Sequence, residues 1–428
     1  MRRWTMSVSI VALLSMATSA AAPHASSGRV QLVERALADD GGPFNALGAS
    51  LFWALWAERH DPERLDANLA WLAERNVDFV RVFAMVGAES WSDRRIDPRA
   101  PGYWESVDGL LARLSRHGLR VQLTMFADAQ VMMPDRAERR RFAERWADRA
   151  AREPERFVLI EVANEHWQNG LTDVEEVRTL ARVVAGRTDV LVALSATQPE
   201  KTCALYAGSG ADVATVHYPR RGGWPSVVQP WRWPADFDRA CPGDLPVAVN
   251  SEPIGPGSSV NDENDPARLV MAYVTTFVSQ NAAYVLHAGA GVRGGGSVDR
   301  AAGRRANLFD VGSLDAALRG IRAAREYLPA GLANWDRHAA AAPSHPFAGF
   351  DAALARGLVT AAPAATSRDR FVVAVLGLTG PVDVRPRRAC TVDVREPLSA
   401  HATRHELGAG EPLRVSGGEA FVLIGSCR

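Results

Sequence analysis

Two glutamates follow apolar segments in this sequence and have the surroundings of a catalytic pair. Glu165 lies beside Asn164 in FVLIEVANEHWQNG, residues 157–170, and Glu252 lies in PVAVNSEPIG, residues 246–255. Two carboxylates at one site can hydrolyse a glycosidic bond, because one protonates the leaving oxygen while the other meets the developing oxocarbenium ion. This chemistry requires a fold that brings Glu165 and Glu252 to one place.

Apolar strand-like segments alternate with helical patterns through the middle of the chain. Segment 103–118 has helical spacing, for example, and a strand-like run follows it. The alternation predicts a parallel sheet, and eight strands in about 290 residues suit a closed (β/α)8 barrel; a doubly wound open sheet is the main alternative. In a barrel the active site lies where the strands end, as Glu165 and Glu252 do in strands four and seven. The expected strands are 44–55, 78–86, 119–126, 156–165, 189–197, 212–219, 245–253 and 282–290.

The two ends of the chain differ from this middle part. Arg2 and Arg3, the apolar run from Met6 to Met16 and small residues near position 20 predict a secretory signal peptide over residues 1–22. An uncleaved anchor is the alternative, although the run is shorter than the ~20 residues of a spanning helix. We therefore expect a secreted or periplasmic protein with no membrane attachment after cleavage. The barrel is expected over residues 30–335.

After Leu328 the pattern predicts a second, smaller domain. Residues 337–346 have the composition of a linker, and beyond them short strand-like runs are separated by Gly and Pro without helices. This predicts an all-β, sandwich-like domain over residues 345–428. Export permits disulfides, and the four cysteines allow three pairings; the local pairing is favoured because each bond then lies within one domain. The expected bonds are Cys203–Cys241 and Cys390–Cys427.

Composition and motif spacing argue against several other functions. Lys plus Arg and Asp plus Glu are both 49, so the chain lacks the positive surplus that binding to a nucleic acid requires. GAGVRG, residues 289–294, has dinucleotide-like spacing, but more glycine follows it instead of a helix start, and no acidic residue stands about 20 positions on in a βαβ frame. His166 and its neighbours lack zinc spacing, and no nucleophile elbow marks a serine. We expect no cofactor and no metal.

The ordered set of Arg81 in FVRVF, Asn164 with Glu165, and Glu252 resembles clan A of the (β/α)8 glycoside hydrolases, which includes cellulases and β-mannanases. The resemblance spans roughly residues 40–330. It implies that Glu165 is the acid/base, that Glu252 is the nucleophile, and that Arg81 is held against Glu252. It also implies that Asn164 binds the sugar hydroxyl next to the anomeric carbon. Independently of the family, Arg81 could form an interior ion pair with Glu161, because buried charges need partners.

Strands six and eight depart from the family pattern. Many members carry His-x-Tyr on strand six, whereas His217 is directly followed by Tyr218, and the tryptophan expected on strand eight is replaced nearby by His287. Trp224, in GWPSVVQPWRWP, could stack on a sugar ring or could pin a long loop. The expected catalytic residues are Glu165 and Glu252; the expected substrate-binding residues are Arg81, Asn164, His217, Tyr218, Trp224 and His287.

The sequence thus predicts a retaining glycoside hydrolase that cleaves β-linked oligo- or polysaccharides by double displacement. Its carboxyl groups should lie about 5 to 5.5 Å apart, and Glu165 should have a raised pKa in order to donate a proton. The alternative is a catalytically inactive glycan-binding barrel, which the altered strands six and eight favour. The identity of the glycan and the oligomeric state are left open.

Overall fold

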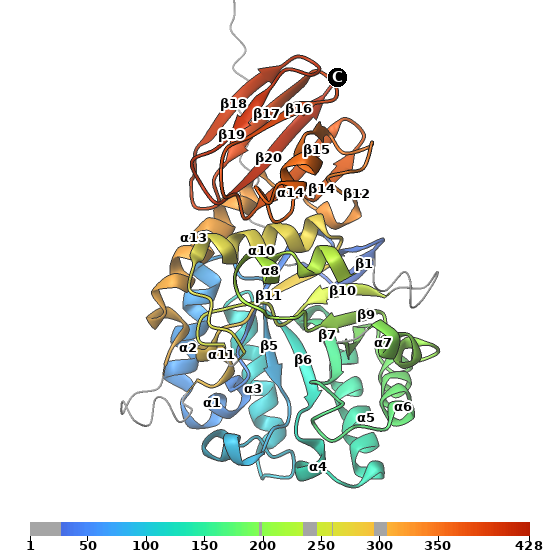
Figure 1. Ribbon diagram of the computed structural model, residues 1–428. Coiled ribbons are helices and arrows are strands. Elements are labelled where there is room, and N and C mark those ends of the chain that lie inside the picture. The colour runs from blue at the N-terminus through green and yellow to red at the C-terminus, as the bar shows by residue number, and fades with distance from the viewer. Residues whose placement is uncertain (1–26, 197–198, 234–245, 259, 295–305) are drawn as a thin grey trace, which may run out of the picture.

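The computed structural model describes residues 27–196, 199–233, 246–258, 260–294 and 306–428 (Figure 1). The expected signal peptide, residues 1–22, lies outside the described residues. Within the described ranges, none of the helices combines the length and apolarity that crossing a lipid bilayer requires.

Eight parallel strands close into a barrel, which confirms the predicted fold and excludes the doubly wound sheet. Each barrel strand pairs with the next along the chain, and the last pairs with the first. All eight lie within the expected segments: β4 (Ala46–Ser50), β5 (Phe79–Phe83), β6 (Arg120–Phe126), β7 (Phe157–Ala163), β8 (Leu191–Ala196), β9 (Val213–Val216), β10 (Val247–Asn250) and β11 (Ala283–Leu286).

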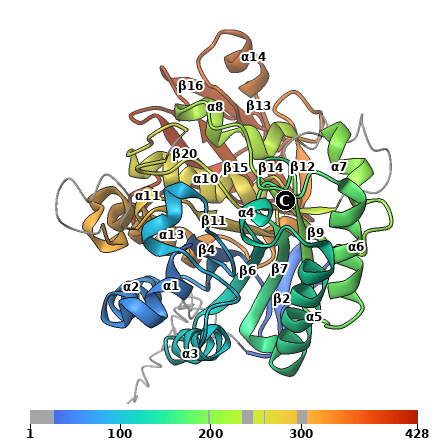
Figure 2. The same ribbon diagram turned by 90° about the horizontal axis from the view of Figure 1, so that it is seen from below.

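Helices surround the strands, as Figure 2 shows from the end of the barrel. Because helices cover the outside and side chains fill the inside, strands such as β7 are buried along their whole length. A polar side chain in such a strand must therefore find a partner inside the barrel. The helices are α1 (Ala54–His60), α2 (Pro62–Glu74), α3 (Tyr103–Arg116), α4 (Ala129–Met132), α5 (Arg136–Arg152), α6 (Val174–Ala185), α7 (Pro199–Tyr206), α8 (Gly223–Val227), α10 (Pro266–Val278), α11 (Gly289–Val292) and α13 (Gly312–Tyr327).

A small antiparallel sheet closes the amino end of the barrel. Leu37 and Phe44 of this sheet share an apolar cluster with Phe79 and Val213, which begin two barrel strands. The carboxyl ends of the strands lie at the opposite end, where active sites of such barrels are built. The sheet contains β1 (Gln31–Val33), β2 (Ala36–Asp39) and β3 (Gly42–Phe44).

The C-terminal region forms an all-β domain with one short helix, α14 (Phe350–Ala355). A six-stranded sheet has the order β12-β14-β15-β20-β17-β18, and a three-stranded sheet has the order β13-β16-β19. The strands are β12 (Asp336–His338), β13 (Phe347–Ala348), β14 (Ala364–Ser367), β15 (Arg370–Leu376), β16 (Val382–Pro386), β17 (Cys390–Arg395), β18 (Ala402–Leu407), β19 (Leu413–Val415) and β20 (Ala420–Cys427).

The six-stranded sheet is buried on both faces where it meets the barrel. In β15, Val372 and Ala374 belong to the barrel's apolar core, whereas Phe371 and Val373 belong to the core of the C-terminal domain. Successive side chains of a strand point to opposite faces, so one face of the sheet packs on the barrel helices and the other on the small sheet. Strand β12 overlaps the start of the segment expected to be a linker and pairs with β14.

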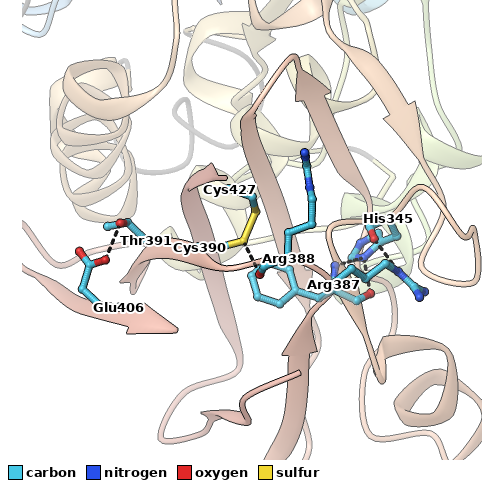
Figure 3. The surroundings of a disulfide bond; sticks show 8 residues. His345, Arg387, Arg388, Cys390, Thr391, Glu406 and Cys427 are labelled. Carbon is cyan, nitrogen blue, oxygen red and sulfur yellow. Dashed lines mark hydrogen bonds between the residues drawn. A yellow bond between two sulfur atoms is a disulfide. The ribbon is translucent and has the colours of Figure 1, made fainter. Parts of the chain in front are cut away.

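The disulfide Cys390–Cys427, expected from the local pairing, joins the start of β17 to the end of β20 (Figure 3). The two residues are direct partners in the antiparallel register, with Cα atoms 4.0 Å apart. The other expected bond involves Cys241, which lies outside the described residues.

Loss of this disulfide should destabilise the C-terminal domain. The bond closes a loop of 37 residues, so the double variant Cys390→Ser, Cys427→Ser should lower the free energy of unfolding by about 4 kcal/mol in the chain-entropy model. Denaturant unfolding of the oxidised protein and the variant measures this difference. An unchanged midpoint and slope would show that the bond does not constrain the unfolded chain.

Candidate active site

Arg81 and Glu161 form a buried ion pair inside the barrel. Both side chains are fully buried; the Nε and Nη2 atoms of Arg81 donate to Glu161 Oε2 at 3.1 and 2.9 Å. The remaining donors reach Glu252 Oε1, at 2.8 Å from Nη1, and Asn164 Oδ1, at 2.8 Å from Nη2. Arg81 therefore makes the interior pair with Glu161 and also contacts Glu252, so the two expected contacts of Arg81 occur together.

Glu161 is held by hydroxyl groups from three other strands. Its Oε1 accepts hydrogen bonds from Ser195 at 2.9 Å and Thr215 at 2.5 Å, and its Oε2 accepts one from Thr124 at 2.5 Å. With both oxygens engaged, Glu161 is positioned to orient Arg81. The sequence analysis missed the three hydroxyl residues; their signal was a small polar residue within each of the apolar strands β6, β8 and β9.

Glu165 and Glu252 face each other with His217 between them. Each glutamate follows a barrel strand by two residues, and His217 directly follows β9. The Nδ1 atom of His217 lies 3.0 Å from Glu165 Oε1 and 3.5 Å from Glu252 Oε2. One ligand atom from each of the three residues lies within 4.8 Å of the others. The side chain of Glu165 is 19% exposed and that of Glu252 is 6% exposed, so the pair is nearly enclosed.

The Oε2 atom of Glu252 has further polar neighbours. Arg220 Nη2 lies 3.3 Å away, and His287 Nε2 lies 3.9 Å away. His287 is oriented by Ser50, whose Oγ lies 3.0 Å from its Nδ1. The sequence analysis singled out His287 but missed Arg220, which stands in the same VHYPR stretch as His217.

These neighbours lower the pKa of Glu252. Burial raises the pKa of this carboxyl, but the two imidazoles and the guanidiniums of Arg81 and Arg220 lower it more, so the pKa lies far below 4.5. Burial lowers the pKa of His287 to about 3, which keeps its imidazole neutral near pH 7. Glu252 is therefore held as a carboxylate.

The pKa of Glu165 is lowered, whereas the sequence analysis expected it to be raised. Burial does raise the pKa of Glu165, and so does the charge of Glu252, but hydrogen bonds from His217 and Gln168 favour the ionised form. The net result is a pKa below 4.5. The expectation was wrong for the free protein because the sequence does not reveal which donors surround this carboxyl.

The turn after β7 fixes the backbone of Glu165 in an unusual conformation. Its φ is 40°, in the left-handed region that non-glycine residues adopt rarely. The Glu165 carbonyl accepts hydrogen bonds from the amides of Gln168 and Asn169, and Asn169 Nδ2 donates to the Asn164 carbonyl at 2.8 Å. Such strain persists only where surrounding contacts enforce it, and it is common at functional sites.

Six of the eight expected site residues gather around the two carboxylates, whereas Tyr218 and Trp224 lie elsewhere. The Tyr218 hydroxyl donates to Asn281 Oδ1 at 2.7 Å, and its ring meets Trp233 edge-on. Tyr218 therefore packs away from the two carboxylates, although it directly follows His217. Trp224 is buried, and its indole donates to Glu419 of the C-terminal domain at 3.0 Å.

Trp167 is an aromatic residue that lies beside His217. It is half-buried, and its ring meets His217 edge-on with centroids 6.3 Å apart. The signal was its position two residues after Glu165, in the loop that a barrel uses for its active site.

The glycines of GAGVRG allow two segments to approach each other at the mouth of the barrel. A Cβ on Gly291 would lie 2.0 Å from the Ser50 carbonyl oxygen, and one on Gly289 would lie 2.3 Å from the Gly257 carbonyl oxygen. The motif thus packs α11 against β4.

The donor set does not suit a metal ion, although Glu165, His217 and Glu252 are close enough to share one. Glu252 already has guanidinium nitrogens at 2.8 and 3.3 Å, from Arg81 and Arg220. A divalent ion there would face two fixed positive charges, which oppose its binding.

Solved structures that share this architecture include glycoside hydrolases. One described as a glycoside hydrolase matches with a TM-score of 0.68 and 13% identity over 94% of this chain and 97% of its own. A family 5 glycoside hydrolase from Bacteroides vulgatus matches with a TM-score of 0.66 and 12% identity over 94% of each chain. A family 39 glycoside hydrolase from Bacteroides cellulosilyticus matches with a TM-score of 0.50 and 11% identity, covering 90% of this chain and 81% of its own.

Comparison by sequence alone finds no match, neither among protein-family models nor among curated proteins. The structural matches include the C-terminal domain as well as the barrel, since they cover 94% of this chain. The protein therefore shares its fold, the barrel together with the C-terminal β domain, with these glycoside hydrolases at low sequence identity.

Proposed function

We propose that the protein is a retaining glycoside hydrolase that acts on β-linked glycans. The observation that supports this most strongly is the placement of Glu165 and Glu252 on either side of His217, with their nearest atoms within 4.8 Å. Retaining enzymes place their carboxyl groups about 5 to 5.5 Å apart, so that one can attack the anomeric carbon directly. Inverting enzymes need a wider gap, which leaves room for a water molecule.

In the first step, Glu252 attacks the anomeric carbon while Glu165 protonates the leaving oxygen. Arg81 holds Oε1 of Glu252 at 2.8 Å, so Oε2 is the atom that forms the bond to the sugar. The low pKa of Glu252 keeps it ionised for this attack. Bound sugar would cover the exposed part of Glu165 and compete with Gln168 for its carboxyl, and both changes raise the pKa of Glu165 towards that of a useful acid.

In the second step, Glu165 removes a proton from water as that water breaks the glycosyl–Glu252 bond. In the free protein, the negative charge of Glu252 raises the pKa of Glu165. Formation of the glycosyl–Glu252 bond removes this charge. Without that charge the pKa of Glu165 is lower, so Glu165 stays ionised and can act as the base. Asn164, held by Arg81, binds the hydroxyl next to the anomeric carbon, and Trp167 offers a ring face to a sugar at the mouth.

The protein is proposed to act outside the cytoplasm, as its expected signal peptide implies. The Cys390–Cys427 bond supports this location, because disulfides persist mainly in oxidising compartments. Its partner is an oligo- or polysaccharide, and the catalytic residues need no cofactor.

A glycan-binding protein without activity is the second candidate. The observation that favours it is the crowding of Glu252 Oε2, which has Arg220 at 3.3 Å and His217 at 3.5 Å. An oxygen shared by these groups must be released before it can attack. If Arg220 does not move when a sugar binds, the site holds the glycan without cleaving it.

A screen of the purified protein distinguishes the two functions. Wild type and Glu252→Ala are incubated in parallel with β-linked polysaccharides and aryl β-glycosides, and released reducing ends or phenols are measured. We expect release by the wild type alone. Binding of a glycan by both proteins with release by neither would favour the second candidate.

His217 should control the pH dependence of the reaction. Glu165 must be protonated to act as the acid, so kcat/KM falls as pH rises through its pKa. His217 lowers that pKa, so His217→Phe should raise it and move the basic limb upward by about one pH unit. The measurement is kcat/KM against pH with a glycoside whose leaving group needs protonation.

The matched control for this prediction is His117→Phe, because His117 contacts Asp66 on a helix away from the carboxylate pair. Its profile should coincide with that of the wild type. A downward movement of the basic limb in His217→Phe would contradict the assignment of Glu165 as the acid.

A further inference from the structure

One face of the C-terminal domain carries a concentration of arginine that the neutral composition of the chain conceals. Two adjoining cavities, of about 320 and 520 Å³, share Arg370 and Phe371 in their linings. Together they are lined by seven arginines and two aspartates: Arg368, Arg370, Arg387, Arg388, Arg395, Arg404, Arg428, Asp369 and Asp393. We call these nine residues the basic face. The whole chain, by contrast, has 49 basic and 49 acidic residues.

The smaller cavity lies beside the Cys390–Cys427 bond and contains unpaired charges. Figure 3 shows Arg387 and Arg388 next to this bond. Arg387 Nε donates to the His345 carbonyl at 2.9 Å, which fixes the base of the guanidinium. Among the described residues, no carboxylate lies within 4.0 Å of Arg368, Arg387 or Arg388. The three guanidiniums are therefore available to an anion.

The larger cavity lies where the six-stranded sheet extends past the end of α13. Arg395 stacks over Tyr327, with its guanidinium carbon 4.5 Å from the ring centre, and Arg370 stacks over Trp335 at 4.9 Å. Stacking holds a guanidinium in one orientation and leaves its edge free to donate hydrogen bonds. Arg395 and Arg404 share Asp393, at the long distances of 3.7 and 3.9 Å.

An arginine-rich composition does not by itself explain the basic face. Several exposed arginines elsewhere have close carboxylate partners: Arg99 lies 2.6 Å from Glu138, and Arg136 lies 2.9 Å from Asp173. A solvated face of the same composition would be expected to show similar pairs. Like charges that line a concave surface repel one another, and they create a positive potential that an anionic ligand relieves.

We propose that the basic face binds an acidic polysaccharide through its carboxylate or sulfate groups. Guanidinium forks recognise these planar or tetrahedral anions with paired hydrogen bonds. Two adjoining cavities suit successive charged sugars of one polymer. A glycan is favoured over a nucleic acid because the same chain carries a barrel with the fold of glycoside hydrolases. The proposal does not depend on catalysis by Glu165 and Glu252.

The test uses the full chain without its expected signal peptide. Binding is measured by calorimetric titration with three polymers: polygalacturonate, its methyl ester, and chondroitin sulfate. We expect binding of polygalacturonate that weakens with salt, and loss of binding when the carboxylates are esterified. Chondroitin sulfate shows whether sulfate groups are also accepted. Binding of the ester as tightly as the acid would overturn the proposal.

The decisive variants are two charge-matched pairs. Arg368→Gln with Arg388→Gln removes two charges from the basic face, and should weaken binding by roughly tenfold or more. Arg140→Gln with Arg141→Gln removes two exposed arginines from α5 of the barrel, far from the C-terminal domain (Figure 1), and should change binding by less than about twofold, because exposed charges far from the basic face are screened.

Arg404→Gln tests the larger cavity separately and should also weaken binding. All these residues are exposed, so unchanged thermal unfolding is expected and checks that each variant is folded. Equal losses in the two charge-matched pairs, or no loss in either, would contradict a specific site. Tighter binding of duplex DNA or of vesicles with anionic lipid would assign the basic face to a different partner.

Discussion

Replacing Glu252 with alanine is expected to abolish turnover of any glycoside that the protein hydrolyses, by more than about 10⁴-fold in kcat. Among the described residues, the other carboxylates that contact Arg81 or His217 are Glu161, which is fully buried, and Glu165, which is assigned the acid/base role. Glu138→Ala, a change on an exposed helix, serves as the control and should keep wild-type activity. Near-normal activity of Glu252→Ala would show that another residue is the nucleophile.

The residual activity of Glu165→Ala should be of a different kind from that of Glu252→Ala. An aryl glycoside with a good leaving group needs little protonation, so the variant should still form the glycosyl–Glu252 bond and then hydrolyse it slowly. Azide needs no base, and it should restore the rate by attacking this intermediate. The product from a β-glycoside should be the β-azide. In Glu252→Ala, azide would have to attack the substrate itself and would give the α-azide.

Loss of Arg81 is expected to affect both stability and catalysis. Arg81→Met leaves Glu161 and Glu252 buried near one another without their shared cation, which should lower the free energy of unfolding by roughly 3 to 5 kcal/mol. Arg81 also lowers the pKa of Glu252. The acidic limb of the pH profile should therefore move to higher pH, because Glu252 is active only when ionised. Chemical unfolding and kcat/KM against pH measure the two effects.

The double variant Arg81→Met, Glu161→Gln separates the two roles. Removing the charge of Glu161 should recover part of the lost stability, since one buried carboxylate no longer needs a cation. It should not restore kcat/KM or the position of the acidic limb, because Glu252 still lacks Arg81. Recovery of activity together with stability would mean that Arg81 is only structural.

The barrel was predictable because its physical signal is local and repeated. Strands such as β7 are buried on both faces and are therefore almost wholly apolar, and each is followed by a helical pattern. The same regularity located Glu165 and Glu252 at strand ends. The β-rich C-terminal domain followed from short strands without helices, although β12 overlaps the start of the expected linker.

The chemistry around the two glutamates was less predictable, because it depends on side-chain direction and on contacts between distant segments. His217 and Tyr218 are adjacent after β9, yet His217 contacts Glu165 whereas Tyr218 contacts Asn281, which the residue pair alone does not reveal. Trp224 is buried, and its indole donates a hydrogen bond to Glu419, which is far away in the sequence. Arg220 approaches Glu252 only through the folded loop after β9. The lowered pKa of Glu165 arises from such contacts.

The anomeric configuration of the first product tests the central claim most directly. Proton NMR during hydrolysis of a β-glycoside, recorded before mutarotation, distinguishes the two anomers at C1. A two-step reaction through Glu252 inverts the configuration twice, so the account predicts the β-anomer as the first product. Initial release of the α-anomer would show that water attacks the sugar directly, and would contradict Glu252 as the nucleophile.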